Sequence, residues 1–452
     1  MKVCVIGTGY VGLVTGVCLA EIGRNVICVD KDESKINMLL NGKMPIYEPG
    51  LDKLVEKNVK KKNLIFSSDV ESAIKSQDII FICVGTPPMP DGSADLQQVE
   101  EVAKVIGNNL NDYKIIVNKS TVPIGSGDWV SMIINDNTNN SHIKSDATFD
   151  VVSNPEFLRE GTAISDTFFP DRIVLGSSSK SAIDTMKKLY EPIISQKFDL
   201  MDISFDPKNS KSIPIVETDL VSAEMIKYAA NSFLATKISY INEIANICEK
   251  AGADVNMISY GIGLDSRIGT KFLNAGIGWG GSCFPKDVLA LTKIAAEYGL
   301  ATQLLNSVVN VNNQQRLKVV QKVQETLKII KGKSIGVLGI SFKPNTDDTR
   351  DSPPITIMNN LVNLGAKVKA YDPVVKKTPE TLNSKVLICG SAEDIFRDSD
   401  LVILATEWED FKDLNYKENG KLMKDMNFID GRNFLDKDEM ISYGFNYLGI
   451  GR

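Results

Sequence analysis

A glycine-rich turn near the N-terminus limits the possible folds of this chain more than any other feature. Residues 1–6 (MKVCVI) are apolar enough for a buried strand, and they run into the turn 7–12 (GTGYVG), after which an apolar helical pattern begins. A second apolar stretch, 25–29, ends at Asp30. Between a strand and a helix, such glycines allow a tight turn and let a pyrophosphate approach the helix N-terminus. The pattern predicts a βαβ unit that binds a dinucleotide at Gly7, Gly9, Tyr10, Val11 and Gly12.

The residues after the second predicted strand indicate which dinucleotide is bound. Asp30 can accept hydrogen bonds from both hydroxyls of the adenosine ribose, which favours NAD over NADP. Lys35 argues in the other direction, because a nearby base could accommodate a 2′-phosphate. We expect NAD as the cofactor, with Asp30 and Lys35 near its ribose.

Composition excludes several classes of protein and of chemistry. The formal net charge of −6 does not favour nucleic acid or an anionic membrane as a partner. We find no stretch that could cross a membrane and no room for a signal peptide, so we expect a cytoplasmic protein. The only histidine, His142, lies in a polar stretch, which argues against histidine-based catalysis. The seven cysteines form no C-x-x-C pair, so we expect no metal.

Periodicity divides the chain into three blocks. Strand and helix patterns alternate up to about residue 210, which is typical of a doubly wound parallel sheet. Residues 217–250 contain neither proline nor glycine and carry apolar residues at helical spacing, which predicts one long helix. Alternation resumes near Lys331. We therefore expect two Rossmann-like α/β domains joined by an all-helical central domain, with bounds of 1–210, 211–330 and 331–452.

Cys283 is the strongest candidate for covalent chemistry. It lies in the segment 278–287 (GWGGSCFPKD), where glycines let the backbone approach a ligand and Lys286 and Asp287 follow within one helical turn. A cysteine in such polar, partly positive surroundings can exist as a thiolate. A buried cysteine after a glycine turn would have the same local sequence. Together with the dinucleotide turn, however, the segment points to a dehydrogenase with a covalent thiol step.

A series of separated motifs resembles, in the right order, those of the UDP-glucose/GDP-mannose dehydrogenase family over essentially the whole chain. The motifs are 7–12 with Asp30, 47–51 (YEPGL), 85–87 (GTP), 120–123 (STVP), 154–161 (NPEFLREG), Lys227 with Asn231, 278–287 and 342–350. The resemblance implies NAD-dependent oxidation of the C6 alcohol of a nucleotide sugar to a carboxylate. It implies UDP-glucose as the substrate, with GDP-mannose as the alternative, a C-terminal domain that binds the UDP-sugar, and a homodimer formed through the central helices.

The resemblance also implies the catalytic roles. Cys283 attacks the aldehyde left by the first oxidation, and the thiohemiacetal becomes a thioester in the second. Lys227 and Asn231, which are i and i+4 on the long helix, stabilise the oxyanion at C6. Asp287 holds or deprotonates a water, and Glu156 is the base for thioester hydrolysis.

Further residues are implied to bind the two ligands. Thr121 would position the hydrolytic water and contact NAD, and Arg267 would reach the sugar across the dimer. The other NAD contacts implied are Thr86, Glu160, Lys286 and Arg350. The substrate contacts implied are Glu156, Phe157, Leu158, Glu160, Lys227, Asn231, Arg267, Lys271, Phe272, Leu273, Gly280, Phe284, Lys343 and Arg432.

Two other classes of protein are alternatives. Single-hydride hydroxyacid dehydrogenases also join a Rossmann domain to helices and use a lysine, but they use no cysteine and do not need a second α/β domain at 331–452. A catalytically silent regulator that binds NAD or a sugar nucleotide would show a gap among the catalytic positions, and the sequence shows no gap there.

Overall fold

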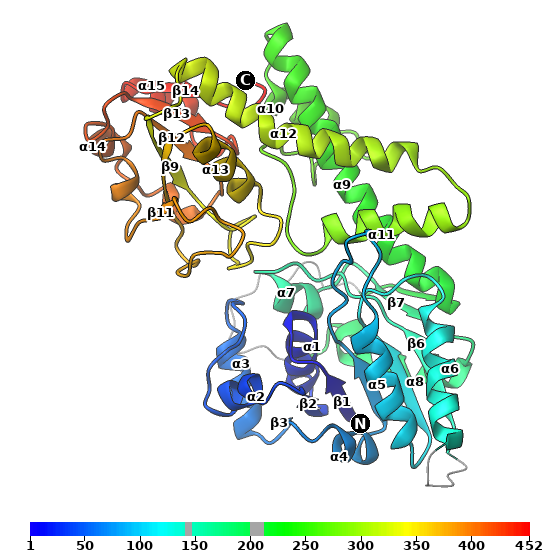
Figure 1. Ribbon diagram of the computed structural model, residues 1–452. Coiled ribbons are helices and arrows are strands. Elements are labelled where there is room, and N and C mark those ends of the chain that lie inside the picture. The colour runs from blue at the N-terminus through cyan, green and yellow to red at the C-terminus, as the bar shows by residue number, and fades with distance from the viewer. Residues whose placement is uncertain (141–146, 199–211) are drawn as a thin grey trace. The chain divides into compact units, whose positions relative to one another are not determined.

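The computed structural model describes residues 1–140, 147–198 and 212–452 (Figure 1). His142 and the predicted boundary at 210 lie outside the described residues. The chain forms two compact units, 1–229 and 230–452, which divide inside the long helix α9 (Leu220–Ala251). The helix predicted for 217–250 is therefore present. The division into three domains stays a prediction.

The first unit is built on an eight-stranded sheet of order β3-β2-β1-β4-β5-β6-β7-β8. Its strands are β1 (Lys2–Ile6), β2 (Asn25–Val29), β3 (Leu64–Ser67), β4 (Ile79–Ile82), β5 (Lys114–Asn118), β6 (Phe149–Ser153), β7 (Ile173–Gly176) and β8 (Ile215–Thr218). This doubly wound order confirms the predicted α/β class. Among the described strand pairs of this sheet, β6 and β7 alone run antiparallel, so the prediction of a parallel sheet is wrong at this pair.

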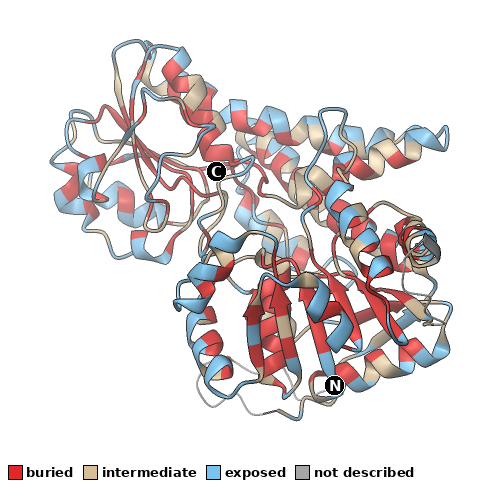
Figure 2. Cartoon of the chain, turned by 60° about the horizontal axis from the view of Figure 1, so that its bottom comes forward, coloured by how far each residue is buried: buried red, intermediate tan, exposed pale blue. Residues whose placement is uncertain are grey.

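Helices cover both faces of this sheet. They are α1 (Tyr10–Glu21), α2 (Glu33–Leu40), α3 (Leu51–Lys60), α4 (Val70–Ser76), α5 (Gln97–Asn108), α6 (Ser126–Asn140), α7 (Ala163–Phe168) and α8 (Lys180–Ser195). Alternate residues of one strand enter different cores: Val3 and Val5 pack with α1, α3, α7 and α8, whereas Cys4 and Ile6 pack with α4, α5 and α6. The central strands are therefore buried on both sides, as Figure 2 shows.

The second unit contains a six-stranded parallel sheet of order β11-β10-β9-β12-β13-β14. Its strands are β9 (Ser334–Leu338), β10 (Lys367–Tyr371), β11 (Leu387–Ile388), β12 (Leu401–Leu404), β13 (Asn427–Asp430) and β14 (Asn446–Leu448). The helices are the remainder of α9 with α10 (Val255–Gly263), α11 (Phe284–Glu297), α12 (Gln303–Leu327), α13 (Pro353–Asn363), α14 (Tyr416–Gly420) and α15 (Lys437–Ser442). Short 3₁₀ helices occur at Glu393–Ile395 and Glu409–Phe411.

Glu224 fastens the start of α9 to the first unit. Its carboxylate accepts hydrogen bonds from the backbone N–H groups of Gly125 (2.6 Å) and Gly127 (2.8 Å), where α6 begins, and from the Ser153 hydroxyl (3.3 Å). Burial raises the pKa of Glu224 to about 7, although these donors oppose the shift. The next turn of α9 carries Lys227, whose position is therefore set by the chain segments around β5 and β6.

Candidate active site

The dinucleotide turn has the geometry that its sequence predicts. Gly7 has φ of +102°, a left-handed conformation that favours glycine. A Cβ on Gly12 would lie 2.0 Å from the Gly7 carbonyl oxygen, so no larger residue fits there. A Cβ on Gly9 would meet no atom of the described residues within 4 Å, and no described side chain caps the N-terminus of α1. This leaves an open helix N-terminus that fits a pyrophosphate.

The acidic residue after β2 is prepared for an unphosphorylated ribose. Asp30 Oδ2 accepts hydrogen bonds from the Thr8 backbone N–H (2.7 Å) and hydroxyl (2.8 Å), which fix the carboxylate beside the turn. Lys35 Nζ lies 3.9 Å from carboxylate oxygens of both Asp30 and Asp32. A 2′-phosphate on the ribose would meet these two carboxylates, so Lys35 does not make the site suitable for NADP. The residues present fit NAD.

A buried ion pair in the first unit joins Glu156 of the motif 154–161 to Lys227 of α9. Lys227 Nζ donates to Glu156 Oε1 (2.8 Å) and to the Glu156 carbonyl (2.7 Å), and the two side chains are only 4% and 5% exposed. Burial opposes ionisation of Glu156. The charge and hydrogen bond of Lys227 and the N–H of Leu158 outweigh it and hold the pKa of the carboxyl below its ordinary value. Glu156 is therefore a carboxylate at neutral pH.

Two cations beside this pair were missed by the sequence analysis. Lys119, directly after β5, donates to the Asn154 side chain (3.1 Å), and burial lowers the pKa of its ammonium group to about 8 while the Glu156 charge opposes that shift. Arg172 stacks on the Phe157 ring, with Cζ 3.7 Å from the ring centroid, and Lys227 Nζ lies 5.4 Å from the same centroid. The available sequence signal that Lys119 belongs to the site is its position directly before the 120–123 motif.

The motif 154–161 is joined to the dinucleotide turn through its last residue. The Gly161 N–H donates to the Tyr10 hydroxyl and to Glu48 Oε2, each at 2.7 Å, and Tyr10 also donates to Glu48. Because Tyr10 opens α1, the segment with Glu156 and Glu160 lies against the cofactor turn. On the neighbouring loops the Thr86 hydroxyl donates to the Thr121 carbonyl (2.8 Å).

Cys283 lies in the second unit at the N-terminus of α11, where it is the N-cap residue, and it is partly exposed. The positive end of a helix macrodipole stabilises a thiolate at this position. The Ser282 hydroxyl oxygen is 3.6 Å from the Cys283 sulfur. The nucleophile predicted from the sequence thus has an environment suited to ionisation.

A hydrogen-bonded carboxylate follows Cys283 by one turn. Asp287 is buried, and it accepts one hydrogen bond from the Asn231 amide (2.6 Å) and another from Lys286 Nζ (2.6 Å) on its other oxygen. Its own N–H donates to the Cys283 carbonyl (2.9 Å). Three predicted site residues are therefore brought together within one turn of the thiol.

The predicted substrate residues of the second unit lie in different environments. The exposed Arg267 pairs with Asp265 (2.6 Å), and the Arg432 Nε lies 3.1 Å from a carboxylate oxygen of Glu407. The Leu273 side chain belongs to the hydrophobic core, and Gly280 is packed against the Asp351 carbonyl, which a Cβ would approach to 2.2 Å. Of the remainder, Lys271 is exposed, Phe272 and Phe284 are in ring contact, Lys343 lies near the Phe342 ring and the exposed Arg350 pairs with Asp348.

Within the described residues, no group of three or more His, Cys, Asp or Glu side chains could hold a metal ion. The helices of the described chain include none with the length and apolar character needed to span a membrane.

Three family models match the chain in sequence order. They describe the NAD binding domain (1–194), the central domain (221–314) and the UDP binding domain (336–437) of the UDP-glucose/GDP-mannose dehydrogenase family. UDP-glucose 6-dehydrogenase TuaD of Bacillus subtilis is 48% identical, over 100% of this chain and 93% of that protein. UDP-glucose 6-dehydrogenase of Rhizobium meliloti is 44% identical over the whole of both. The structure of a UDP-glucose dehydrogenase from Pyrobaculum islandicum superposes with a TM-score of 0.88 at 34% identity, covering 100% of this chain and 98% of that one.

Removal of one member of the buried ion pair should destabilise the fold more than removal of both. Lys227→Met leaves the Glu156 carboxylate buried without its partner, which costs about 3–5 kcal/mol in comparable pairs. We expect the variant Lys227→Met/Glu156→Gln to recover a large part of that loss. Urea unfolding at pH 7 of the wild type, both single variants and the double variant measures the coupling. Additive effects of the two substitutions would contradict a direct interaction.

Proposed function

Because the chain belongs to the UDP-glucose/GDP-mannose dehydrogenase family, we propose that it oxidises UDP-glucose to UDP-glucuronate. Each turnover consumes two NAD+ and one water. The observation that carries the four-electron chemistry is the partly exposed Cys283 at the N-terminus of α11, with the Asn231–Asp287–Lys286 hydrogen bonds one turn away. A single-hydride dehydrogenase needs no such thiol.

Residues of the first unit are suited to hold the cofactor. The open N-terminus of α1 at Gly9 would receive the pyrophosphate, and Asp30 would take the adenosine ribose. When bound, NAD+ accepts the hydride that leaves C6 of the sugar. Thr86 and Thr121 stand on neighbouring loops joined by a hydrogen bond, which supports a shared role in fixing the cofactor.

The first oxidation requires that the C6 hydroxyl lose its proton as the hydride departs. We assign the water that takes this proton to Asp287. Both carboxylate oxygens of Asp287 already accept one hydrogen bond each, from Asn231 and Lys286, and each retains a lone pair for a water molecule. Lys227 and Asn231 lie one turn apart on α9, and we assign both to the oxyanion that forms at C6.

The aldehyde is captured before it can leave. The Cys283 thiolate forms a carbon–sulfur bond to C6, which gives a thiohemiacetal, and loss of the second hydride converts this adduct to a thioester. Water then cleaves the carbon–sulfur bond and releases the acid and the thiol. The N-terminus of α11 stabilises the thiolate both before attack and as the leaving group.

Glu156 is suited to activate the hydrolytic water. The lowered pKa of its carboxyl keeps it ionised at neutral pH, and the pairing with Lys227 holds it in one orientation. A carboxylate of low pKa is a weak base, so its contribution depends on position and on the adjacent positive charge. Thr121 would orient the same water.

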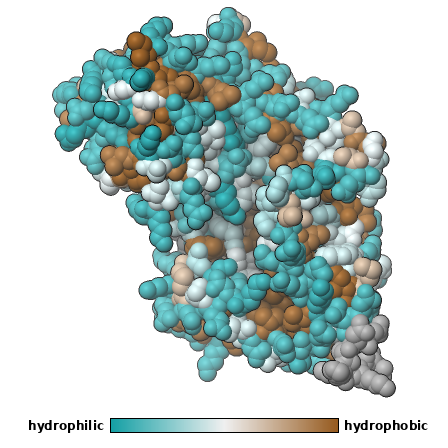
Figure 3. Space-filling model, in the orientation of Figure 1, coloured by the Kyte–Doolittle hydropathy of each residue, from teal (hydrophilic) through white to brown (hydrophobic). Residues whose placement is uncertain are grey.

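A homodimer through the central helices is supported by the exposed face of α9. Phe233, Tyr240 and Ile247 recur at intervals of seven residues and are 67%, 53% and 56% exposed. Apolar side chains also gather in patches on the face of the molecule drawn in Figure 3. Large apolar side chains in a row on one helix are typical of a covered interface.

All seven cysteines are free, which is consistent with a cytoplasmic location.

The proposed reaction is tested by its stoichiometry. Purified protein with excess NAD+ and a limiting amount of UDP-glucose should release two NADH per UDP-glucose, and much less with GDP-mannose or UDP-N-acetylglucosamine. One NADH per sugar would contradict the thiol step and favour a single-hydride enzyme. Absence of NADH with every nucleotide sugar would favour a binding protein without chemistry.

The proposed dimer is tested by charged residues in the α9 row. We expect the variant Phe233→Lys/Tyr240→Lys to sediment as a monomer, because two buried charges without partners disfavour association. Leu40→Lys, which replaces an exposed apolar residue of α2 in the first unit, is the matched control and should leave the dimer intact. An unchanged sedimentation coefficient for the double variant would exclude this face of α9 as the interface.

A further inference from the structure

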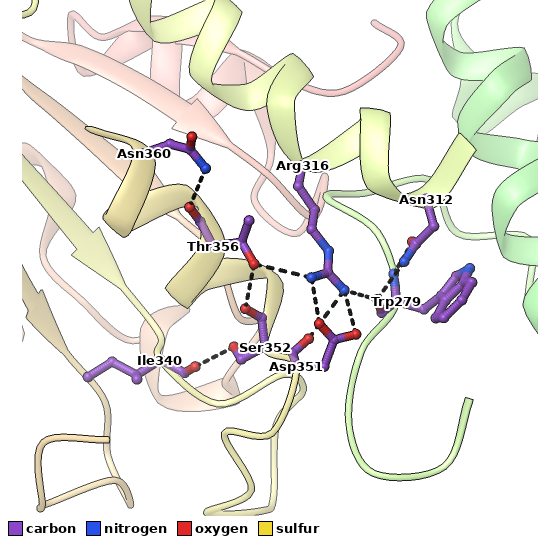
Figure 4. Close-up of polar contacts among 8 residues, drawn as sticks. All are labelled: Trp279, Asn312, Arg316, Ile340, Asp351, Ser352, Thr356 and Asn360. Atoms are coloured by element: carbon purple, nitrogen blue, oxygen red, sulfur yellow. Dashed lines mark hydrogen bonds and ion pairs between the residues drawn. The ribbon is translucent and has the colours of Figure 1, made fainter. Parts of the chain in front are cut away.

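The segment that carries Cys283 is held by side chains of α12. Asn312 is buried, and its amide makes two hydrogen bonds to the backbone of Trp279: its Oδ1 accepts from the N–H (2.8 Å), and its Nδ2 donates to the carbonyl (2.9 Å) (Figure 4). The Trp279 indole N–H donates to the Ser239 hydroxyl (3.0 Å). Trp279 is therefore fixed at its backbone by α12 and at its ring by α9.

Arg316, one turn further along α12, joins this backbone to a second loop. One guanidinium nitrogen donates to the Trp279 carbonyl (2.9 Å), and the two terminal nitrogens pair with the two carboxylate oxygens of Asp351 at 2.8 and 2.9 Å. A further hydrogen bond reaches the Thr356 hydroxyl (3.1 Å) in α13 (Figure 4). Arg316 is only 6% exposed. A planar guanidinium can bind these acceptors at once, whereas a lysine ammonium cannot match the bidentate geometry.

The glycines before Cys283 are shaped to this second loop. A Cβ on Gly280 would lie 2.2 Å from the Asp351 carbonyl oxygen, and a Cβ on Gly281 would lie 2.7 Å from the Phe342 ring. The Gly281 N–H donates to the Arg350 carbonyl (3.0 Å). The two glycines thus allow the Cys283 segment to pack directly on the loop 342–351.

Asp351 has an unusual backbone conformation at this contact. Its φ of +45° is in the left-handed region, which is uncommon for a residue with a side chain. The bidentate pair with Arg316 is the interaction that holds Asp351 in place. The strained loop and the Cys283 segment therefore share one anchoring group.

We propose that Arg316 is a positioning residue for the nucleophile. By fixing the Trp279 carbonyl against Asp351, Arg316 holds the segment 279–283 so that Cys283 stays at the N-terminus of α11. The inference deepens the proposed function and rests on it, because Cys283 matters only if the thiol reacts. Arg316 contacts neither Cys283 nor a reacting atom in this arrangement, so its effect on catalysis is indirect.

Reactivity of the thiol tests this role without any nucleotide sugar. The rate of Cys283 alkylation by iodoacetamide at pH 7, followed by peptide mass spectrometry, should fall about ten-fold in Arg316→Met, because a displaced thiol loses part of the stabilisation that the helix N-terminus gives to its thiolate. With UDP-glucose, kcat should fall on the order of 10²-fold with little change in KM, as expected for a misplaced reacting group. Lys322→Met removes another ion pair of α12, the one with Glu249, and should change neither rate.

The result that would overturn the proposal is a folded Arg316→Met protein whose Cys283 is alkylated at the wild-type rate, because Arg316 would then serve stability alone. If Arg316→Met does not fold, Asp351→Asn decides the matter. Its side chain is 42% exposed, so folding should survive, and slower alkylation is again expected. Absence of NADH from the wild type with every nucleotide sugar would refute the proposed function while leaving the alkylation rates interpretable.

Discussion

The buried pair of Lys227 and Glu156 is the interaction on which the arrangement of the first unit depends. Two charges that are almost completely removed from water must be paired, and this requirement fixes where α9 meets the segment after β6. Glu224 adds a second anchor one turn earlier by binding the start of α6. Tyr10 and Glu48 join the far end of the same segment to the cofactor turn. Cofactor loop, carboxylate and lysine thus form one connected structure.

The second unit uses the same strategy for its nucleophile. Cys283 has a helix N-terminus beside it and the Asn231–Asp287–Lys286 hydrogen bonds one turn away. The segment before it is fixed by a buried amide and a buried guanidinium rather than by apolar packing alone. Polar groups held in this way reorganise little when charge develops, which is the property that electrostatic catalysis requires.

The sequence predicted those features that depend on local spacing. The dinucleotide turn, the long helix and the two doubly wound sheets follow from glycine positions and from the hydrophobic period, and all are present, although only the second sheet is parallel throughout. The antiparallel pairing of β6 and β7 could not be foreseen, because the direction of a strand depends on its partner and not on its own pattern. The burial of Lys227 depends on its pairing with Glu156, which lies 71 residues earlier in the sequence, so the local pattern of the helix does not predict it.

Contacts between residues distant in sequence set the limit of prediction. Lys119, Arg172 and Arg316 are ordinary cations in the sequence, and only the fold shows which partners they meet. The missing Cβ of Gly280 accommodates the Asp351 carbonyl, a contact that the sequence does not reveal, and the role of Gly280 toward the substrate stays a prediction.

The thioester at Cys283 is the central claim. Glu156→Gln, given UDP-glucose and excess NAD+ and quenched in acid, should yield a peptide in which Cys283 carries the UDP-glucuronyl group. Unmodified Cys283 in a variant that has released NADH would contradict the account.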